Sequence, residues 1–275
     1  MIRVGCHVSI KQGYAGAARE AARLGCSVFQ YFPKNPRSLS VKVFDEGDAS
    51  RCRTFCRERD IVSVAHAPYP VNLAADDARL AEATRLSVLN DLAIADANGS
   101  IGVVVHFGKY AGPDPLAGYR NILAMLNRIL AEWFGRALLL IENQAGRFGS
   151  TPEELAQIRR LCDDPERIGF CLDTCHAFAS GLWNGRNWAE LEERCGELDF
   201  FDHVKVVHLN DSRHPSGSRR DAHANIGLGM IGSASMAEAV RSLARRGIPF
   251  VLETPESRAL PLQAEMNRVK EFADD

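Results

Sequence analysis

The sequence contains no run of 18 or more consecutive apolar residues, so we expect no transmembrane helix. Its first ten residues, MIRVGCHVSI, lack a long apolar segment and a small-residue cleavage site, so no signal peptide is predicted. Positive charge is not in excess either, because 33 Lys and Arg residues against 35 Asp and Glu residues give a formal net charge of -2. A protein-wide basic field for nucleic acid or an anionic membrane is therefore missing, although bound divalent cations would add positive charge that this count omits.

Two sequence motifs are also absent. None of the eight cysteines belongs to a CxxC pair, and no GxGxxG follows the first strand-like segment. The cysteines are scattered, with Cys52 and Cys56 one turn apart in a segment of helical character. We therefore predict free, buried thiols and a reducing, cytoplasmic location. The missing glycine motif counts against a doubly wound open sheet.

The chain does contain a regular alternation of short β-rich segments with segments of helical periodicity. Eight such repeats in 275 residues are typical of a closed (β/α)8 TIM barrel, which usually needs about 250 residues. A doubly wound open sheet is the alternative. No linker or low-complexity segment interrupts the pattern, so residues 1–275 are predicted to form a single domain. The predicted strands are 2–6, 28–32, 62–65, 102–105, 138–141, 169–172, 205–209 and 249–252.

Six consecutive predicted strands end in a side chain that can ligate a metal. Taken singly, a histidine there can be a hydrogen-bonded residue of the barrel rim, and a carboxylate can be a helix cap. Together, uncompensated carboxylates at one barrel mouth would repel one another and lose hydration, and cations would remove that penalty. The C-terminal ends of the strands are also where barrel enzymes build their sites. The six residues are His66, His106, Glu142, Asp173, His208 and Glu253.

Three further residues extend this set. His176 follows Asp173 by three positions, and Asp221 and His223 stand at i and i+2 in the long polar connection 210–232, where an extended backbone points both the same way. Imidazole with carboxylate suits zinc, or manganese as a second choice. Nine candidate ligands fit two or three ions, which can activate water and hold the oxygens of an in-line phosphoryl displacement.

Two other residues near this cluster have alternative interpretations. Cys175, within FCLDTCHAFASG, can be a nucleophile, a thiolate ligand or a buried thiol. We favour the buried thiol. His7 follows the first strand on the same rim, where it could contact a phosphate or serve the structure.

Several motifs together resemble endonuclease IV, the zinc-dependent apurinic/apyrimidinic endonuclease family of DNA repair. They occur in order from about residue 3 to residue 256, and DTCHAFASG and HLND followed by DAH are the most specific. The motifs are GCHVS, KNPR, HAPYPVNLA, IENQAG, CLDTCHAFASG, HLNDS and GSRRDAHANIGLGMIG.

The resemblance implies three zinc ions at the C-terminal face of a TIM barrel, and the ligand chemistry makes Mn2+ the expected substitute. By motif, His66 and His106 would hold the first zinc, and Glu142 would bridge it to the second. Asp173, His208 and Glu253 would complete the second site. The third zinc would be held by His176, Asp221 and His223. Glu142 and Glu253 are the expected catalytic carboxylates.

The expected reaction is hydrolysis of the phosphodiester bond 5′ to an abasic site in double-stranded DNA, leaving a 3′-hydroxyl, with trimming of 3′ ends. A metal-dependent sugar isomerase or epimerase on a related barrel is the alternative. The set of His176, Asp221 and His223 exceeds what a sugar site around one or two ions needs, and a non-catalytic DNA-binding scaffold would require missing ligands. We expect a monomer with no obligate protein partner and no membrane association.

DNA contacts are expected from loops on the barrel rim. Arg37, Tyr69 and Pro70 are the expected inserts into the kinked duplex, and Lys109 and Arg219 are expected phosphate contacts. Departures from the family pattern fall in these loops: Lys109 and Tyr110 replace a Gly-Ser-His, Leu39 stands where an aromatic is frequent, and Pro70 replaces an aliphatic side chain. Further rim cations are Lys34, Arg147, Arg213 and Arg220.

Overall fold

Eight parallel strands form a closed barrel in the computed structural model, which describes residues 2–146 and 148–274. The barrel closes because β1 pairs with β2 on one side, with Gly5 opposite Val28, and with β10 on the other, with Cys6 opposite Leu252. The TIM-barrel prediction is confirmed, and an open sheet is ruled out. The barrel strands are β1 (Val4–His7), β2 (Val28–Tyr31), β3 (Val62–His66), β4 (Gly102–His106), β5 (Leu138–Glu142), β6 (Ile168–Asp173), β7 (Val204–His208) and β10 (Phe250–Leu252).

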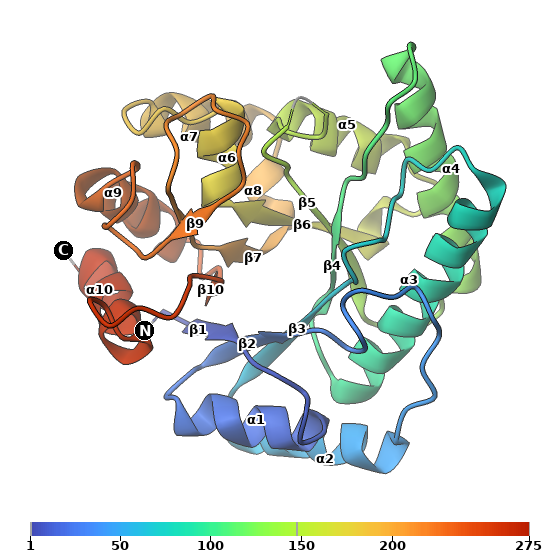
Figure 1. Cartoon of the computed structure of the whole chain (residues 1–275), viewed down its shortest axis with the longest axis horizontal. Helices are drawn as coiled ribbons and strands as arrows, with labels where there is room; N and C mark the ends of the chain where they lie inside the picture. The colour runs from blue at the N-terminus through green and yellow to red at the C-terminus, as the bar shows by residue number, and fades with distance from the viewer. Residues whose placement is uncertain (1, 147, 275) are drawn as a thin grey trace.

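Helices surround the barrel, as Figure 1 shows. Several begin at the side-chain caps that their sequences carry: the Asp45 carboxylate accepts from the Asp48 N–H, and Thr151 and Glu154 form a capping box. The helices are α1 (Tyr14–Arg23), α2 (Glu46–Glu58), α3 (Ala78–Asn98), α4 (Pro115–Glu132), α5 (Pro152–Leu161), α6 (Thr174–Ser180), α7 (Trp188–Glu197), α8 (Phe200–His203), α9 (Ser233–Ala244) and α10 (Leu262–Asp274), with a 3-10 turn at Pro165–Arg167.

The long connection between β7 and α9 is ordered by a small antiparallel ribbon. Its strands, β8 (Asp211–Ser212) and β9 (His223–Ala224), have two residues each. Asp211 lies opposite Ala224, and Ser212 lies opposite His223. The unusually long 210–232 connection is therefore an ordered loop with its own short β-ribbon on the rim of the barrel.

Alternation along the strands places the site. One buried residue from each of seven strands packs at the barrel centre: Val28, Val64, Val104, Leu140, Cys171, Val206 and Val251. Because successive side chains of a strand point to opposite faces, the residue two positions further along also points inward. Those next inward residues are Gln30, His66, His106, Glu142, Asp173, His208 and Glu253. The apolar barrel centre is thus the floor of a polar mouth.

In the described part of the chain, no helix combines the length and the hydrophobicity that crossing a bilayer requires.

Candidate metal centre

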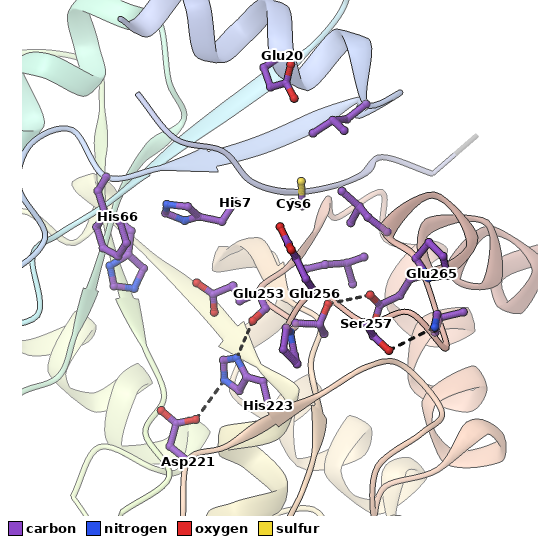
Figure 2. Close-up of a pocket in the computed structure, with 18 of the residues that line it drawn as sticks. Cys6, His7, Glu20, His66, Asp221, His223, Glu253, Glu256, Ser257 and Glu265 are labelled. Carbon is purple, nitrogen blue, oxygen red and sulfur yellow. Dashed lines mark hydrogen bonds and ion pairs between the residues drawn. The ribbon is translucent and has the colours of Figure 1, made fainter. Parts of the chain in front are cut away.

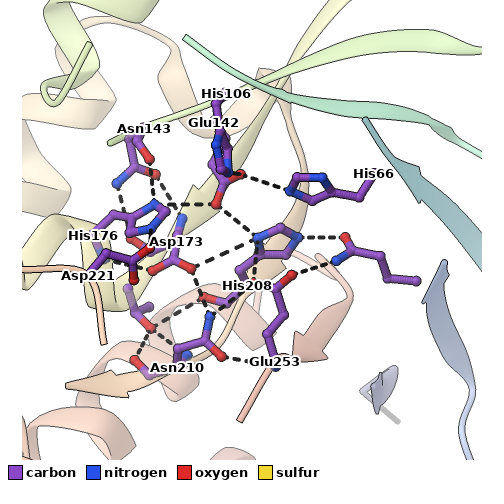
Figure 3. Close-up of polar contacts among 12 residues, drawn as sticks. His66, His106, Glu142, Asn143, Asp173, His176, His208, Asn210, Asp221 and Glu253 are labelled. Atoms are coloured by element: carbon purple, nitrogen blue, oxygen red, sulfur yellow. Dashed lines mark hydrogen bonds and ion pairs between the residues drawn. The ribbon is translucent and has the colours of Figure 1, made fainter. Parts of the chain in front are cut away.

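All nine predicted ligands lie together at the C-terminal mouth of the barrel; Figure 3 shows eight of them, and Figure 2 shows His223 beside Asp221. In the first set, the Nε2 atoms of His66 and His106 lie 3.6 and 3.2 Å from Glu142 Oε2. The other carboxylate oxygen of Glu142, Oε1, lies 3.0 Å from His208 Nδ1. Glu142 therefore stands between two groups of ligands, which is the position that a bridging carboxylate requires.

The second set surrounds His208. Its Nδ1 atom lies 3.3 Å from Glu253 Oε2 and 3.9 Å from Asp173 Oδ2. The side chains of His208 and Asp173 are fully buried. The carboxylates of Glu142, Asp173 and Glu253 thus all lie within 3.9 Å of one buried imidazole, and they need positive charge to offset their loss of hydration.

The third set joins α6 and the connection that contains the β8–β9 ribbon. Asp221 Oδ2 lies 3.3 Å from His176 Nε2, and Asp221 Oδ1 lies 3.1 Å from His223 Nε2. Asp173 positions His176 locally, because it is the N-cap of α6 and its carboxylate accepts from the His176 N–H at 2.7 Å. As the i and i+2 spacing predicts, Asp221 and His223 face the same group.

The histidines are oriented by hydrogen bonds at the ring nitrogen that faces away from the site. His66 Nδ1 lies 2.7 Å from the Ala67 carbonyl, and His176 Nδ1 lies 2.8 Å from the Asn143 carbonyl. His208 donates from Nε2 to Gln30 Oε1 at 2.7 Å. Each bond leaves the opposite nitrogen facing the carboxylates, as metal-ligating histidines require.

Protonated histidines balance the negative charge of the carboxylates in this cluster. Burial opposes ionisation of Glu142, but the charges of His208 and His106 hold the pKa of its carboxyl well below the usual value. Burial likewise opposes ionisation of Glu253, while His208 and other groups bring its pKa down to about 2. Burial lowers the pKa of His223, but the Asp221 carboxylate, 3.1 Å from its Nε2 atom, and the other nearby carboxylates raise it to about 9. A histidine binds a metal ion only when it is neutral, so metal binding here would release these protons.

Two atoms show that the cluster fits metal ions. Glu142 Oε2 and His223 Nε2 are buried and make no hydrogen bond to the described residues, although His106 Nε2 and Asp221 Oδ1 lie 3.2 and 3.1 Å from them. A buried polar atom without a partner costs about 1–3 kcal/mol, and more if it is charged. Both atoms belong to predicted ligand sets and face other ligand atoms, so a divalent cation would satisfy both.

Comparisons with known proteins agree with this geometry. A family model described as a xylose isomerase-like TIM barrel matches residues 18–272. A probable endonuclease 4 from Symbiobacterium thermophilum is 42% identical over 257 residues, which are 92% of this chain and 93% of that protein. One from Methanoculleus marisnigri is 35% identical over 99% of both chains. The crystal structure of endonuclease IV from Thermus thermophilus superposes with a TM-score of 0.85 at 34% identity, over 99% of both chains.

The chain belongs to the endonuclease IV family. The resemblance drawn from the sequence motifs is therefore confirmed. A D-tagatose 3-epimerase-like protein superposes with a TM-score of 0.70 at 18% identity, over 99% of this chain and 97% of that one. At that identity the likeness shows the shared barrel fold alone.

Three carboxamide side chains of this endonuclease IV family member complete the centre, and sequence reasoning missed them. Gln30 donates to Glu253 Oε1 at 2.6 Å, Asn143 Oδ1 accepts from the Asp173 N–H at 2.8 Å, and Asn210 donates to Asp173 Oδ2 at 2.8 Å. The signal for Gln30 was its place two residues after Val28, which makes it the inward residue of β2 at the level of the ligands. Asn143 and Asn210 lie directly after Glu142 and two residues after His208.

The cysteines near the centre are buried and protonated. Cys171 and Cys175 both lie close enough to other ligand atoms to be considered. Burial raises the pKa of each thiol to about 12, so neither is a thiolate at neutral pH. All eight cysteines are free and buried, as predicted. The raised pKa supports the interpretation of Cys175 as a buried thiol over that of a nucleophile.

A cavity of about 1010 Å³ opens beside the centre (Figure 2). His66, His106, His223 and Glu253 line its inner end, and His7 and Tyr69 line its wall. Burial lowers the pKa of His7 to about 4, and its ring packs 4.6 Å from that of Phe32. His7 is therefore neutral and held by its neighbours, which favours the structural interpretation of this residue.

Of the predicted DNA-contacting residues, Tyr69 lines this cavity. Tyr69 is 62% exposed, its ring touches Phe32 edge-on at 5.2 Å, and its N–H donates to the Pro36 carbonyl at 2.9 Å. The loops after β2 and β3 are thereby joined. Arg37, Pro70, Lys109 and Arg219 are all exposed, and so are Arg213 and Arg220. Arg147 lies outside the described residues.

One predicted rim cation is wrongly assigned. The side chain of Lys34 is only 3% exposed, and its Nζ lies 2.9 Å from Asp91 Oδ1 of α3 and donates to the Ser87 carbonyl at 2.8 Å. It points into the space between the rim loop and α3 instead of toward solvent. Lys34 cannot contact a phosphate from this position.

Proposed function

We propose that this protein hydrolyses the phosphodiester bond 5′ to abasic sites in double-stranded DNA, leaving a 3′-hydroxyl, and that it trims blocked 3′ ends. Membership of the endonuclease IV family supports the substrate and the reaction. The observation that carries the proposal is the division of nine ligands, of which only Asp221 is exposed, into three sets, with two buried atoms that make no hydrogen bond facing the space between them.

The three sets correspond to three zinc ions in this proposal, with Mn2+ as a substitute. His66, His106 and Glu142 would hold the first, Glu142 with Asp173, His208 and Glu253 the second, and His176, Asp221 and His223 the third. Bound divalent ions supply acidity to a coordinated water and neutralise charge on phosphate oxygens during displacement.

The protein's own residues set the geometry for that chemistry. Glu142 uses both oxygens, 3.2 Å from His106 Nε2 and 3.0 Å from His208 Nδ1, so it keeps the first two sets at a fixed separation. Gln30 holds Glu253 on one side and His208 on the other, at 2.6 and 2.7 Å. A loss of either carboxylate would unbalance the buried imidazoles, so we propose Glu142 and Glu253 as the catalytic carboxylates.

The exposed rim residues would engage the duplex. An abasic nucleotide has lost its stacking, so turning it out of the helix costs less than turning out a paired base. Tyr69 and Pro70 stand beside the cavity that would receive it, and Arg37, Lys109 and Arg219 offer exposed positive charge around them. A protein with a net charge of -2 depends on such local contacts, because it has no overall basic field.

A sugar epimerase is the second candidate, because such enzymes share the barrel. The third set argues against it. Asp221 lies 3.1 and 3.3 Å from two histidines, and this set would be superfluous around one or two ions.

Zinc analysis of protein purified without chelator, together with incision of a duplex that carries a single abasic site, tests the proposal. We expect three ions per chain, a 3′-hydroxyl product and no requirement for added Mg2+, because the ligands are buried. His223→Asn should lose zinc and activity. His7→Asn is the matched control, since His7 lies in the same cavity outside the three sets, and it should keep all its zinc.

A wild-type stoichiometry of one ion, or an equal loss of zinc in His7→Asn, would contradict the three-set assignment. Epimerisation of a ketose without incision of DNA would favour the second candidate. The protein should elute as a monomer, which size-exclusion chromatography with light scattering can check.

A further inference from the structure

Two of the proposed ligands of the third set belong to a segment that cannot position itself. Asp221 and His223 lie in the 210–232 connection, whose regular structure is the β8–β9 ribbon of two residues per strand. An isolated two-stranded ribbon is marginally stable in water even when it is longer. Something else must fix the path of the chain as it returns from the rim to α9.

The carboxylate of Asp211 is placed to do this. Asp211 is fully buried, and no Lys, Arg or His of the described chain forms an ion pair with it. Instead it accepts hydrogen bonds from five backbone N–H groups, and bonds to an ionised acceptor are roughly twice as strong as neutral ones. The donors are Ser212 (2.7 Å), Ile231 (2.9 Å), Gly229 (3.0 Å), Gly227 (3.1 Å) and Gly232 (3.3 Å).

The glycines of the NIGLGMIG stretch match this carboxylate. A Cβ atom at Gly229 would lie 2.4 Å from Asp211 Oδ1, so only glycine allows the backbone to approach this closely. Gly227 and Gly232 have φ values of 76° and 82°, which turn their N–H groups toward the same oxygen. The Met230 N–H also donates to the Ser212 carbonyl at 2.7 Å.

A second buried carboxylate holds the start of the same stretch. Glu265 of α10 accepts from the Ile226 N–H at 2.7 Å and from Asn225 Nδ2 at 3.0 Å. Residues 225–232 are therefore held at both ends, and this stretch directly follows β9. His223 lies just before it, with Nε2 3.1 Å from Asp221 Oδ1 and Nδ1 3.3 Å from the Glu253 carbonyl. Moving the held stretch would move His223.

We propose that Asp211 is a positioning residue for the third metal-binding set, because its amide contacts hold residues 227–232, the stretch that follows His223, while the Arg219 N–H to Ala179 carbonyl bond holds the chain before Asp221. The inference rests on the proposed metal function. It assigns to Asp211 no contact with metal or substrate. Loss of the carboxylate should weaken one ion of three and leave the sets built on rigid barrel strands.

Asp211→Asn and Asp211→Ala test the proposal. Asparagine keeps the volume but presents an NH2 group to some of the five amide donors. We expect one ion per chain to bind about 10–100-fold more weakly than in the wild type, the usual effect of removing a group that orients metal ligands. Zinc content after dialysis against graded chelator measures this. Trypsin supplies a second readout, because Arg219 and Arg220 are exposed in the same segment and should be cleaved faster.

Asp48→Asn is the matched control, since the Asp48 carboxylate of α2 also accepts a backbone N–H, from Tyr14 at 2.6 Å, but lies outside the metal-binding sets. It should keep three ions and wild-type cleavage at Arg219 and Arg220. His223→Ala calibrates the loss of the third ion. If His223→Ala leaves the zinc content unchanged, the proposed metal centre is wrong. If His223→Ala loses an ion while Asp211→Asn and Asp211→Ala keep all three with normal affinity, Asp211 has no positioning role and the inference is overturned.

Discussion

Replacing Lys34 by methionine is expected to destabilise the barrel strongly at alkaline pH and little at acid pH. Lys34 and Asp91 form a buried ion pair, with side chains that are 3% and 0% exposed and a 2.9 Å separation. Removing one partner of such a pair leaves an uncompensated buried charge, which typically costs about 3–5 kcal/mol. Methionine has nearly the length of lysine without its charge, so packing changes little.

The pH dependence follows from Asp91. Burial raises the pKa of its carboxyl to about 7, even though Lys34 opposes the shift. The Asp91 carboxyl therefore has a higher pKa in the folded protein than in the unfolded one. Its contribution to the free energy of unfolding is complete below the ordinary value of 3.8 and is lost as the pH rises through about 7. The shift corresponds to about 4 kcal/mol. Without Lys34 the pKa should rise further, so the difference between variant and wild type should grow as the pH increases above 7.

Urea denaturation of metal-free protein, followed by far-UV circular dichroism at pH 5.5 and 8.5, measures this difference. We expect Lys34→Met to lose at most about 1 kcal/mol at pH 5.5 and about 2 kcal/mol more at pH 8.5, because each pH unit above the wild-type pKa of about 7 adds about 1.4 kcal/mol. The double variant Lys34→Met/Asp91→Leu should recover most of the loss at pH 8.5, since no charge is left unpaired. An equal loss at both pH values, or a double variant less stable than the single one, would refute the reasoning.

Three further predictions concern the site. Glu142→Gln should abolish incision and lower the zinc content, because a neutral amide replaces the carboxylate between His106 and His208; near-normal turnover in a steady-state assay would contradict the two-set role of Glu142. Arg37→Ala and Tyr69→Ala should weaken binding to abasic duplex by about tenfold more than binding to intact duplex, because inserted side chains act only where the duplex is kinked. The zinc content of both variants should be unchanged. Equal losses of affinity for the two duplexes in a fluorescence-anisotropy titration would identify ordinary backbone contacts. Cys175→Ala should keep incision within about twofold of the wild type, since a buried thiol with a pKa of about 12 is not a nucleophile; a loss of several orders of magnitude would restore that role.

Much of the metal centre was readable from the sequence because its ligands obey strand periodicity. Each of His66, His106, Glu142, Asp173 and His208 is the last residue of its strand, two positions after a residue of the barrel centre. A parallel barrel brings all such positions to one rim, so local sequence predicted a three-dimensional cluster. The pair Asp221 and His223 was predictable for a similar reason, since an i and i+2 spacing in extended chain has one geometric outcome.

Where prediction went wrong, the deciding contact joined residues distant in the chain. Lys34 was predicted as a rim cation because its partner, Asp91, is distant in the sequence. The two residues meet only when α3 packs beside the loop after β2. Gln30 was missed because an amide is no attractive metal ligand, and its role depends on His208 and Glu253, more than 170 residues away, meeting it at 2.7 and 2.6 Å.

Asp211 shows the division between sequence and tertiary structure. The sequence by itself predicted the barrel, the rim and the nine candidate ligands, because periodicity and residue chemistry are local properties. Only the folded chain decided that the carboxylate of Asp211 faces five backbone N–H groups and not a metal ion. The two outcomes use the same residue type at the same rim, and they differ only in which groups the rest of the chain brings within hydrogen-bonding distance.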